Sequence, residues 1–546
     1  MVDRQAAADW RPDYELLLRG GTVVDGTGGP PRRADVLIRD GRIASMERHR
    51  PGFPLPQHTI DVGGLVVAPG FIDMHSHSDL AVLADPEHIA KVAQGVTTEV
   101  LGQDGLSYAP VTDATLGQLR EQLRGWNGDP ELDYDWRSVG EYLDRIDRGA
   151  AVNAAYLVPH GTVRLAVMGT DERAATAEEL ARMRALVEEG LAQGAAGLST
   201  GLTYTPGMYA DDEEIVELCA AVRAHGGYYC PHHRNYGAEV VRGYLDCLEI
   251  ARRAQVPLHL AHCHVNFPPN AGRAHEVLDA IDRASAEHGL DVTLDTYPYL
   301  AGATYLAALL PSRVQAGGTA ATLARLRDPA RRAEIAHEIE VSGSDGHHGM
   351  PMDWSTIVIS GTGEEQAWAV GRSIAELAAE RGAAPAELFF DLLLADELAT
   401  GCLVQVGNED NVRAIMTHRA HTGGSDGILV GARPHPRGWG TFPRYLGHYV
   451  RELGLLSLEE AVAHFTSRPA RRLGLADRGV LRRGAVADLV VFDPDRVADT
   501  ATYENPKRRP AGIEHVFVNG VKTLAYGRRT GLLPGRALRR RTDPRG

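Results

Sequence analysis

Residues 65–80 read LVVAPGFIDMHSHSDL, a short apolar run that ends in two histidines two positions apart. Side chains two apart on an extended strand point to the same side, so His75 and His77 would present their imidazoles together. Two such imidazoles can share one divalent metal ion. Taken alone, the pattern is better explained by polar residues at a strand end, because short motifs recur by chance.

Apolar runs that end in polar residues recur along the chain and alternate with Ala-, Leu-, Glu- and Arg-rich stretches. Residues 176–194 (TAEELARMRALVEEGLAQG) are one such stretch and favour a helix. Apolar strands alternating with helices indicate a parallel sheet covered on the outside, with function at the carboxyl ends of the strands. The sequence therefore predicts an α/β fold, a (β/α)8 TIM-type barrel.

Both ends of the chain have a different pattern, with short β-branched runs separated by Gly and Pro in residues 15–46, 487–497 and 513–527. We expect a small β-sandwich domain built from both chain termini. The predicted boundaries are 1–66 for its N-terminal part, 67–470 for the barrel, and 471–546 for its C-terminal part and tail. Residues 311–354, which contain the Gly/His-rich SGSDGHHGM, are expected to form a lid-like insert in the barrel.

Composition restricts the class of protein. With 546 residues, 44% of them hydrophobic and 24% charged, the chain resembles a soluble globular protein, and its start does not resemble a secretory signal. The cysteines are few and odd in number, which is typical of free thiols in a reducing compartment. They are Cys219, Cys230, Cys247, Cys263 and Cys402. We expect a cytoplasmic protein without membrane binding, and the oligomeric state stays open.

The net charge of −15 disfavours a general nucleic-acid surface. The basic segment 537–546 (ALRRRTDPRG) is expected to be a solvated chain end rather than a binding arm.

Further histidines close other apolar runs, namely His232 in GGYYCPHHRNYG and His262 in VPLHLAHCHVN. Imidazole ligands suit Zn, Fe, Ni or Co, and the ligand type does not choose among them. Asp426, in HTGGSDGILVGARPHPRGWG, ends the last predicted barrel strand. A carboxylate there can take a proton from a metal-bound water and return it to a leaving nitrogen. Alone, Asp426 would be a turn residue, since Gly-Ser-Asp-Gly suits a turn.

Together these motifs resemble the amidohydrolase superfamily, and within it the N-acyl-D-amino-acid deacylases. The resemblance covers nearly the whole chain. It rests on GFIDMHSHSDL, PHGTVR, GAAGLSTGLTYTPGMYA, DTYPYLAGAT, and SDG followed by PHPR, in this order. It implies a barrel with a terminal β-sandwich and one or two divalent metal ions, with Zn²⁺ the expected one.

The resemblance also implies a role for each matching residue. His75, His77 and Asp426 would bind or flank one metal position, and His232 and His262 the other. Tyr204 and Arg437 would hold the substrate's α-carboxylate, Arg437 through bidentate guanidinium geometry. His160 would assist at the carbonyl oxygen, although a structural hydrogen bond explains it equally well.

Two positions depart from the family pattern. Asp104, in GVTTEVLGQDGLSYAP, stands where the deacylases have a metal-binding cysteine, and it is expected to ligate or bridge metal, with a turn residue as the alternative. His264 stands where they have a lysine that holds the carboxylate. An imidazole that titrates near neutrality would make anion binding pH-dependent. Metal preference and substrate could therefore differ from those of the family.

The expected reaction is attack by metal-bound hydroxide on the amide of an N-acyl-D-amino acid or a related N-acyl compound, with Asp426 as the general base. Opening of a cyclic amide or cleavage of a dipeptide-like bond is the nearest alternative. A catalytically silent metal-binding scaffold is a further one, disfavoured because a scaffold has no need of a general base.

Overall fold

The computed structural model, described here for residues 15–48 and 55–540, contains eight parallel strands in one sheet. They are β6 (Phe71–Asp73), β7 (Val96–Leu101), β8 (Asn153–Pro159), β9 (Gly197–Gly201), β10 (Tyr228–His232), β11 (Leu258–Leu260), β12 (Val292–Thr296) and β16 (His421–Gly423). Neighbours pair in chain order. The first and last strands meet where the Met74 amide donates to the Gly423 carbonyl at 3.1 Å. This nearly closed sheet confirms the predicted barrel.

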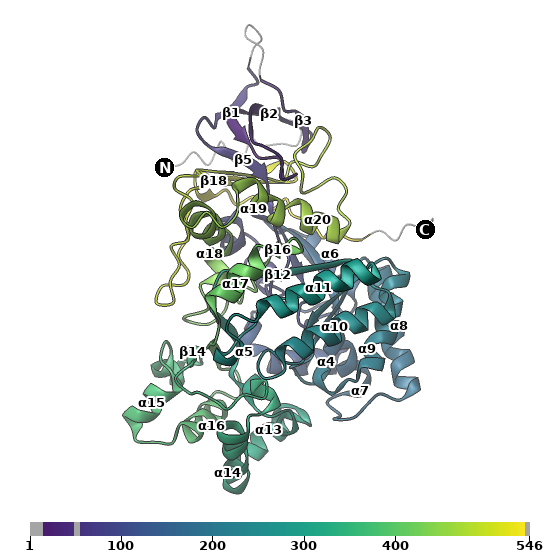
Figure 1. Ribbon diagram of the computed structural model, residues 1–546, viewed down its shortest axis with the longest axis vertical. Coiled ribbons are helices and arrows are strands. Elements are labelled where there is room, and N and C mark those ends of the chain that lie inside the picture. The colour runs from purple at the N-terminus through teal and green to yellow at the C-terminus, as the bar shows by residue number, and fades with distance from the viewer. Residues whose placement is uncertain (1–14, 49–54, 541–546) are drawn as a thin grey trace.

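Helices cover the outside of the barrel (Figure 1). The main ones are α6 (Val139–Asp147), α7 (His160–Met168), α8 (Ala177–Ala192), α9 (Asp212–Ala224), α10 (Val240–Ala254), α11 (Ala274–His288) and α17 (Glu409–Met416). In α8 a capping box between Thr176 and Glu179 begins the helix. Its buried Met183, Val187 and Leu191 recur every four residues, so one stripe packs on the strands.

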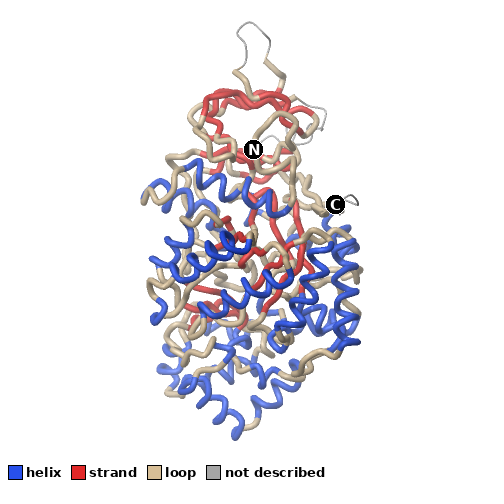
Figure 2. Tube along the Cα trace, turned by 45° about the vertical axis from the view of Figure 1, so that its right-hand side comes forward, coloured by secondary structure: helices blue, strands red, loops and turns tan. Residues whose placement is uncertain are grey.

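Both chain ends contribute to one nine-stranded sheet, seen in red at the top of Figure 2. Its strands are β1 (Leu16–Val23), β2 (Arg32–Arg39), β3 (Arg42–Ser45), β4 (His58–Asp61), β5 (Val66–Pro69), β17 (Leu489–Phe492), β18 (Ile513–Val518), β19 (Val521–Ala525) and β20 (Arg528–Arg529). The two ends join where β5 pairs antiparallel with β17. The predicted terminal β-domain made from both ends is thus confirmed, while the exact boundaries at 66 and 470 stay a prediction.

The side chains of β17 alternate between two hydrophobic clusters, and this attaches the terminal domain to the barrel. Leu489 and Val491 pack into the core of the terminal domain, whereas Val490 and Phe492 face a second cluster that includes Phe71 and Phe465 of the barrel. Successive side chains of a strand point to opposite faces, so one apolar strand serves two cores. The terminal domain and the barrel therefore share a buried interface.

An excursion between β12 and β16 lies at the lower left of Figure 1. It contains a three-stranded antiparallel sheet and several helices. These are β13 (Ala301–Tyr305), β14 (Ile357–Gly361), β15 (Gly401–Gln405), α12 (Ser312–Gln315), α13 (Gly318–Arg327), α14 (Pro329–His337), α15 (Ile374–Arg381) and α16 (Pro385–Ala395). The insert expected at 311–354 lies inside this larger unit. In this unit β13 pairs with β15, about one hundred residues further along the chain, and a local sequence pattern cannot reveal such a pairing.

The end of the described chain is docked, which corrects the expectation of a solvated tail for residues 537–540. Ala537 forms a bridge with Ala154 of β8, and Arg539 makes ion pairs with Asp144 and Asp147 of α6. Residues 541–546, like the start of the chain at 1–14, lie outside the described residues.

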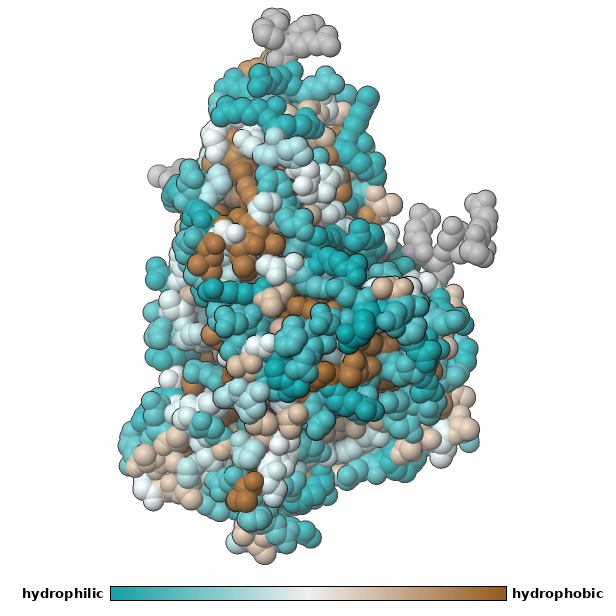
Figure 3. All heavy atoms as spheres, in the orientation of Figure 1, coloured by the Kyte–Doolittle hydropathy of each residue, from teal (hydrophilic) through white to brown (hydrophobic). Residues whose placement is uncertain are grey.

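The face of the molecule in Figure 3 is mainly hydrophilic, with a brown patch near α18 (Arg437–Arg444) and α19 (Leu458–Phe465). Among the described helices, none combines the length and the apolar character needed to span a bilayer.

Candidate metal centre and active site

The carboxyl ends of the barrel strands bring the predicted metal ligands together. His232 is the last residue of β10, while His75, Asp104, His262 and Asp426 follow their strands by two or three residues. His75 and His77 therefore lie just beyond β6 rather than on it, held by a bridge between Ser76 and Gly427. All these side chains are buried.

A first group consists of His75, His77, Asp104 and Asp426, whose ligand atoms lie within 4.8 Å of one another. His77 Nε2 is 3.1 Å from Asp426 Oδ1 and 3.5 Å from Asp104 Oδ2. His75 Nε2 is 3.4 Å from Asp104 Oδ1. Four buried donors of this kind can surround one metal ion.

A second group consists of Asp104, His232 and His262. Asp104 Oδ2 lies 3.3 Å from His232 Nδ1 and 3.3 Å from His262 Nε2. Asp104 thus belongs to both groups and lies between them. A carboxylate has two oxygens, so this residue can bridge two metal positions.

The donor atoms fit a divalent metal ion. His75 Nδ1 and Nε2, His77 Nε2 and Asp104 Oδ1 are buried, and although oppositely charged partners lie within 4 Å of them, none of these contacts has the geometry of a hydrogen bond. Buried polar atoms are normally satisfied, so such a cluster indicates a ligand. Burial opposes a charge on His75, but Asp104 and Asp295 outweigh it and hold the pKa of His75 well above its usual range. A cation in this position would replace that proton.

The loops that carry these ligands have unusual backbone conformations. Asp104, His262 and Asp426 have φ angles of +52°, +28° and +48°, in the left-handed region that side chains rarely adopt. Next to Asp104, a Cβ on Gly105 would lie 2.5 Å from the Gly201 amide nitrogen, so the loop packs directly against β9. Strain of this kind is typical of functional sites.

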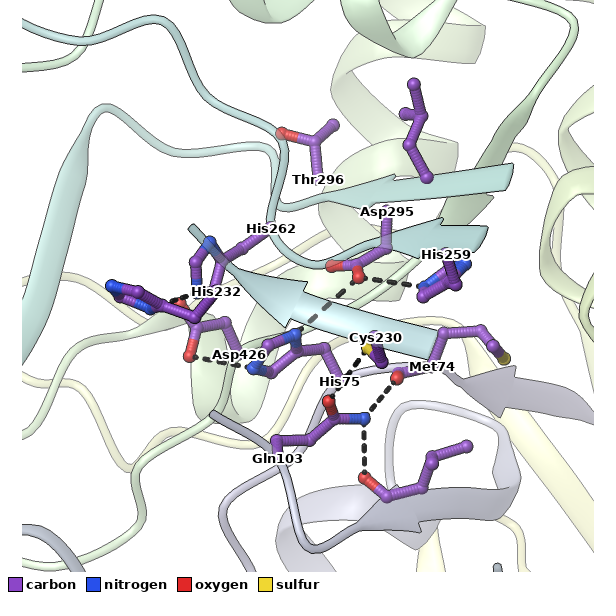
Figure 4. A network of polar contacts seen from close by, with 12 residues as sticks. Met74, His75, Gln103, Cys230, His232, His259, His262, Asp295, Thr296 and Asp426 are labelled. Carbon is purple, nitrogen blue, oxygen red and sulfur yellow. Dashed lines mark hydrogen bonds and ion pairs between the residues drawn. The ribbon is translucent and has the colours of Figure 1, made fainter. Parts of the chain in front are cut away.

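Asp295 of β12 orients His75 by contacting its Nδ1, the ring nitrogen that points away from the other metal ligands, as Figure 4 shows. Its Oδ2 is 3.6 Å from His75 Nδ1 and 3.1 Å from His259 Nε2. This leaves His75 Nε2 to face Asp104 and Asp426. A carboxylate behind a histidine ligand is a common support of metal sites. Asp295 stands in DTYPYLAGAT, and no local sequence pattern indicates its contact with His75.

A second supporting network, which no local sequence pattern reveals, joins the ends of the first and last barrel strands. Lys91 Nζ lies 2.6 Å from Asp73 Oδ2 and 2.8 Å from Ser425 Oγ, and the Ser425 amide donates to Asp73 Oδ1 at 2.8 Å. All three residues are fully buried. This network fixes the loop that carries Asp426 to the strand that precedes His75.

Replacing Lys91 by Met should lower the free energy of unfolding by about 3–5 kcal/mol, because it leaves Asp73 as an uncompensated buried charge. Chemical denaturation followed by circular dichroism measures the change. Lys507→Met, at an exposed position, is the control and should stay within about 0.5 kcal/mol of the parent. Equal stability of the two variants would contradict a role for this network.

A cavity opens onto the metal groups. It is lined on one side by Asp104, His232, His262 and Asp426, and on the other by residues of the excursion. The latter include Gly302, Ala303, Thr304, Leu309, His347, His348 and Val404. Tyr204 and His264 also line it, as the resemblance implies for residues that contact substrate.

Tyr204 and His264 are both uncharged near neutral pH. Burial raises the pKa of the Tyr204 phenol well above its usual range, so its hydroxyl remains a donor. Burial, with help from the charges of His262 and Arg437, lowers the pKa of His264 to about 3. This corrects the expectation that His264 titrates near neutrality, since the buried imidazole remains neutral.

Arg437 lies directly beside the cavity, and the role toward the substrate's carboxylate that the resemblance implies for it stays a prediction. Its side chain is fully buried, its Nε has no hydrogen-bond partner among the described residues, and it contacts Asp426 and Tyr297, which line the cavity. Nη1 lies 2.9 Å from Asp426 Oδ2, and Cζ lies 4.4 Å from the centre of the Tyr297 ring. The guanidinium thus lies behind Asp426, and it holds the pKa of that carboxyl well below its usual range although burial opposes this.

His160 belongs to another polar cluster. Its Nε2 is 2.7 Å from Glu214 Oε1, and Glu214 also pairs with Arg164. It does not line the cavity. Of the two roles considered for His160, this placement favours a structural hydrogen bond over assistance at the carbonyl oxygen of the substrate.

Comparison with known proteins agrees with this geometry. A family model described as "Amidohydrolase family" matches residues 58–523, so the chain belongs to the amidohydrolase family. It is 41% identical over 529 residues to a D-aminoacylase of Alcaligenes xylosoxydans xylosoxydans, covering 96% of this chain and 98% of the relative. An N-acyl-D-aspartate deacylase of the same organism is 37% identical, with coverage of 98% and 97%.

Solved structures of deacylases are also similar to this chain. The N-acyl-D-glutamate deacylase of Bordetella bronchiseptica, complexed with zinc and a phosphonate mimic of the tetrahedral intermediate, superposes with a TM-score of 0.81. It is 35% identical and covers 97% of this chain and all of its own. A crystal structure of D-aminoacylase also has a TM-score of 0.81, with 37% identity and coverage of 96% and 100%.

Proposed function

We propose that this chain is a divalent-metal-dependent hydrolase, with zinc the expected metal, that cleaves the amide bond of N-acyl-D-amino acids. The observation that carries the proposal is the pair of metal-ligand groups that share Asp104 and open onto one cavity beside Asp426. Relatives with deacylase activity and a zinc-containing structural neighbour support it.

A divalent ion held by the two groups would supply Lewis acidity, polarising the amide carbonyl and making an attacking water more acidic. Asp426 would accept the proton of that water at Oδ1 and return it to the departing nitrogen. Tyr204 and His264 would hydrogen-bond to the acidic end of the substrate as uncharged groups, and Arg437, beside Asp426, would supply the positive charge that the α-carboxylate needs.

The cavity favours an uncharged side chain on the substrate. Among the described residues that line it, none is a lysine or an arginine, and Leu309, Val404, Val406 and Phe267 make one wall apolar. A second carboxylate, as in N-acyl-D-aspartate or N-acyl-D-glutamate, would be desolvated there without a cation to pair with it. We therefore expect N-acetyl-D-leucine to be a better substrate than either acidic compound.

The test combines elemental analysis of the purified protein with hydrolysis of N-acetyl-leucine, N-acetyl-aspartate and N-acetyl-glutamate in D and L forms. One to two equivalents of metal and a kcat/KM at least about tenfold higher for N-acetyl-D-leucine than for the acidic D compounds would support the proposal. Metal without turnover of any N-acyl amino acid would refute this substrate class, and cyclic amides would then be assayed. Protein without metal would refute the whole proposal.

A further inference from the structure

The tip of the excursion presents two neighbouring histidines to the cavity. His347 and His348, in the Gly/His-rich segment SGSDGHHGM, both line it, and neither has a role in the proposed reaction. The His347 side chain is only 2% exposed, whereas His348 is half-buried. Nε2 of His347 is buried without a hydrogen-bond partner among the described residues. Buried polar atoms are normally satisfied, so an orphaned nitrogen in a cavity wall points to a ligand.

The one hydrogen bond of the His347 ring decides which nitrogen carries the proton. Nδ1 lies 2.9 Å from the Met350 carbonyl oxygen. A carbonyl oxygen can only accept, so Nδ1 must carry a proton and donate it. Burial lowers the pKa of His347, so at neutral pH the ring has only this one proton. Nε2 is therefore a bare nitrogen, which can accept a hydrogen bond but cannot donate one.

The backbone around this acceptor is fixed on two sides. On one side the Asp345 carboxylate accepts a hydrogen bond from the Ser312 amide at 2.9 Å, within the excursion. On the other side the His348 carbonyl accepts from the Ala238 amide at 3.1 Å and from Asn235 Nδ2 at 3.0 Å. Asn235 and Ala238 belong to the barrel loop that follows β10. The fold therefore sets where the acceptor lies relative to the metal groups.

The wall beside His347 is apolar and partly aromatic. The Phe267 ring meets the His347 ring in a T-shaped arrangement, with 5.1 Å between the centroids. Leu309, Val404 and Val406 line the same cavity. A substrate side chain that extends along this wall contacts carbon atoms first and the bare nitrogen where it reaches the tip. Such a combination suits a side chain with an apolar body and a polar end.

We propose that His347 is a specificity-determining residue that selects substrates with an aromatic side chain ending in a hydrogen-bond donor, as in N-acyl-D-tyrosine and N-acyl-D-tryptophan. The inference rests on the proposed function and names the substrate class of the same site. A phenol or an indole can donate to Nε2 while its ring packs against Phe267. A phenyl side chain would leave the acceptor unpaired, and a carboxylate would turn its own lone pairs toward it.

Two substrates that differ only in the phenol hydroxyl, N-acetyl-D-tyrosine and N-acetyl-D-phenylalanine, test the inference. In the parent protein kcat/KM should favour the tyrosine compound at least about threefold, the contribution of one neutral hydrogen bond. This ratio should fall to about one in His347→Leu, which removes the acceptor. His347→Gln should keep it, because the amide oxygen can replace Nε2. Both substrates are assayed on one sample, so the fraction of folded or metal-loaded protein does not affect the ratio.

His337→Leu is the matched control, since His337 is an exposed histidine of the same excursion outside the cavity wall, and its ratio should equal that of the parent. A parent ratio below about threefold, an unchanged ratio in His347→Leu, or an equal fall in His337→Leu would overturn the inference. So would a fall in His348→Leu without one in His347→Leu, or hydrolysis of N-acetyl-D-leucine without either aromatic compound. These outcomes leave the proposed function intact, whereas a parent protein that hydrolyses no N-acyl amino acid would overturn both.

Discussion

Asp426→Asn is expected to lower kcat for N-acetyl-D-leucine by about 10²–10⁴-fold, the usual contribution of a positioned general base. The amide of asparagine has nearly the same shape as the carboxylate but cannot take a proton. In the structure Asp426 Oδ1 faces His77, and Oδ2 contacts Arg437, so the substitution also leaves that cation without its partner. Initial rates measured at saturating substrate give the change.

The metal content of the Asp426→Asn variant decides how its loss of activity is interpreted. If the variant keeps the metal of the parent, the loss belongs to proton transfer; if it loses one equivalent, Asp426 is needed as a ligand. Asp410→Asn, at an exposed position on α17, is the control and should match the parent in both rate and metal content. A fully active Asp426→Asn would exclude Asp426 as the base.

Asp104→Ala should have the broadest effect on metal binding, because Asp104 is the residue shared by both ligand groups. We expect the affinity for the more weakly held ion to fall at least about a hundredfold, with activity falling in parallel. Dialysis against zinc buffers followed by elemental analysis measures the bound equivalents. Unchanged metal content would reduce Asp104 to a turn residue.

Asp104→Cys is the informative companion variant. A thiolate is a softer donor than a carboxylate and binds zinc well, so this change should restore zinc binding that Asp104→Ala loses. The cysteine should also shift metal preference toward zinc and away from harder ions such as Mn²⁺. Equal preference in the parent and in Asp104→Cys would show that Asp104 does not contact metal.

The fold and the ligand positions could be predicted from sequence because both follow from local patterns. Apolar strands alternating with amphipathic helices indicate a barrel, and polar residues at strand ends must meet at one rim. His75, His232, His262 and Asp426 meet at that rim, whereas the role of each as a metal ligand is implied by the family resemblance.

Contacts between distant residues could not be predicted in this way. Lys91 approaches Ser425 only because β6 and β16 close the barrel, and Tyr503 reaches His435 only because the terminal domain packs beside α18. The placement of Arg437 behind Asp426 depends on the path of the α18 backbone. Burial likewise decides the charge of His264, whose neutral state no spacing reveals.

The pairing of β5 with β17 also sets an order of events during synthesis. Val67 pairs with Val491, so one edge of β5 has no partner until more than four hundred further residues have been made. At 5–20 residues per second this interval is about 20–80 s. Throughout it an apolar strand edge remains free to pair with other chains. A lower growth temperature or co-expression of chaperones should therefore raise the soluble yield more than substitutions in the barrel would.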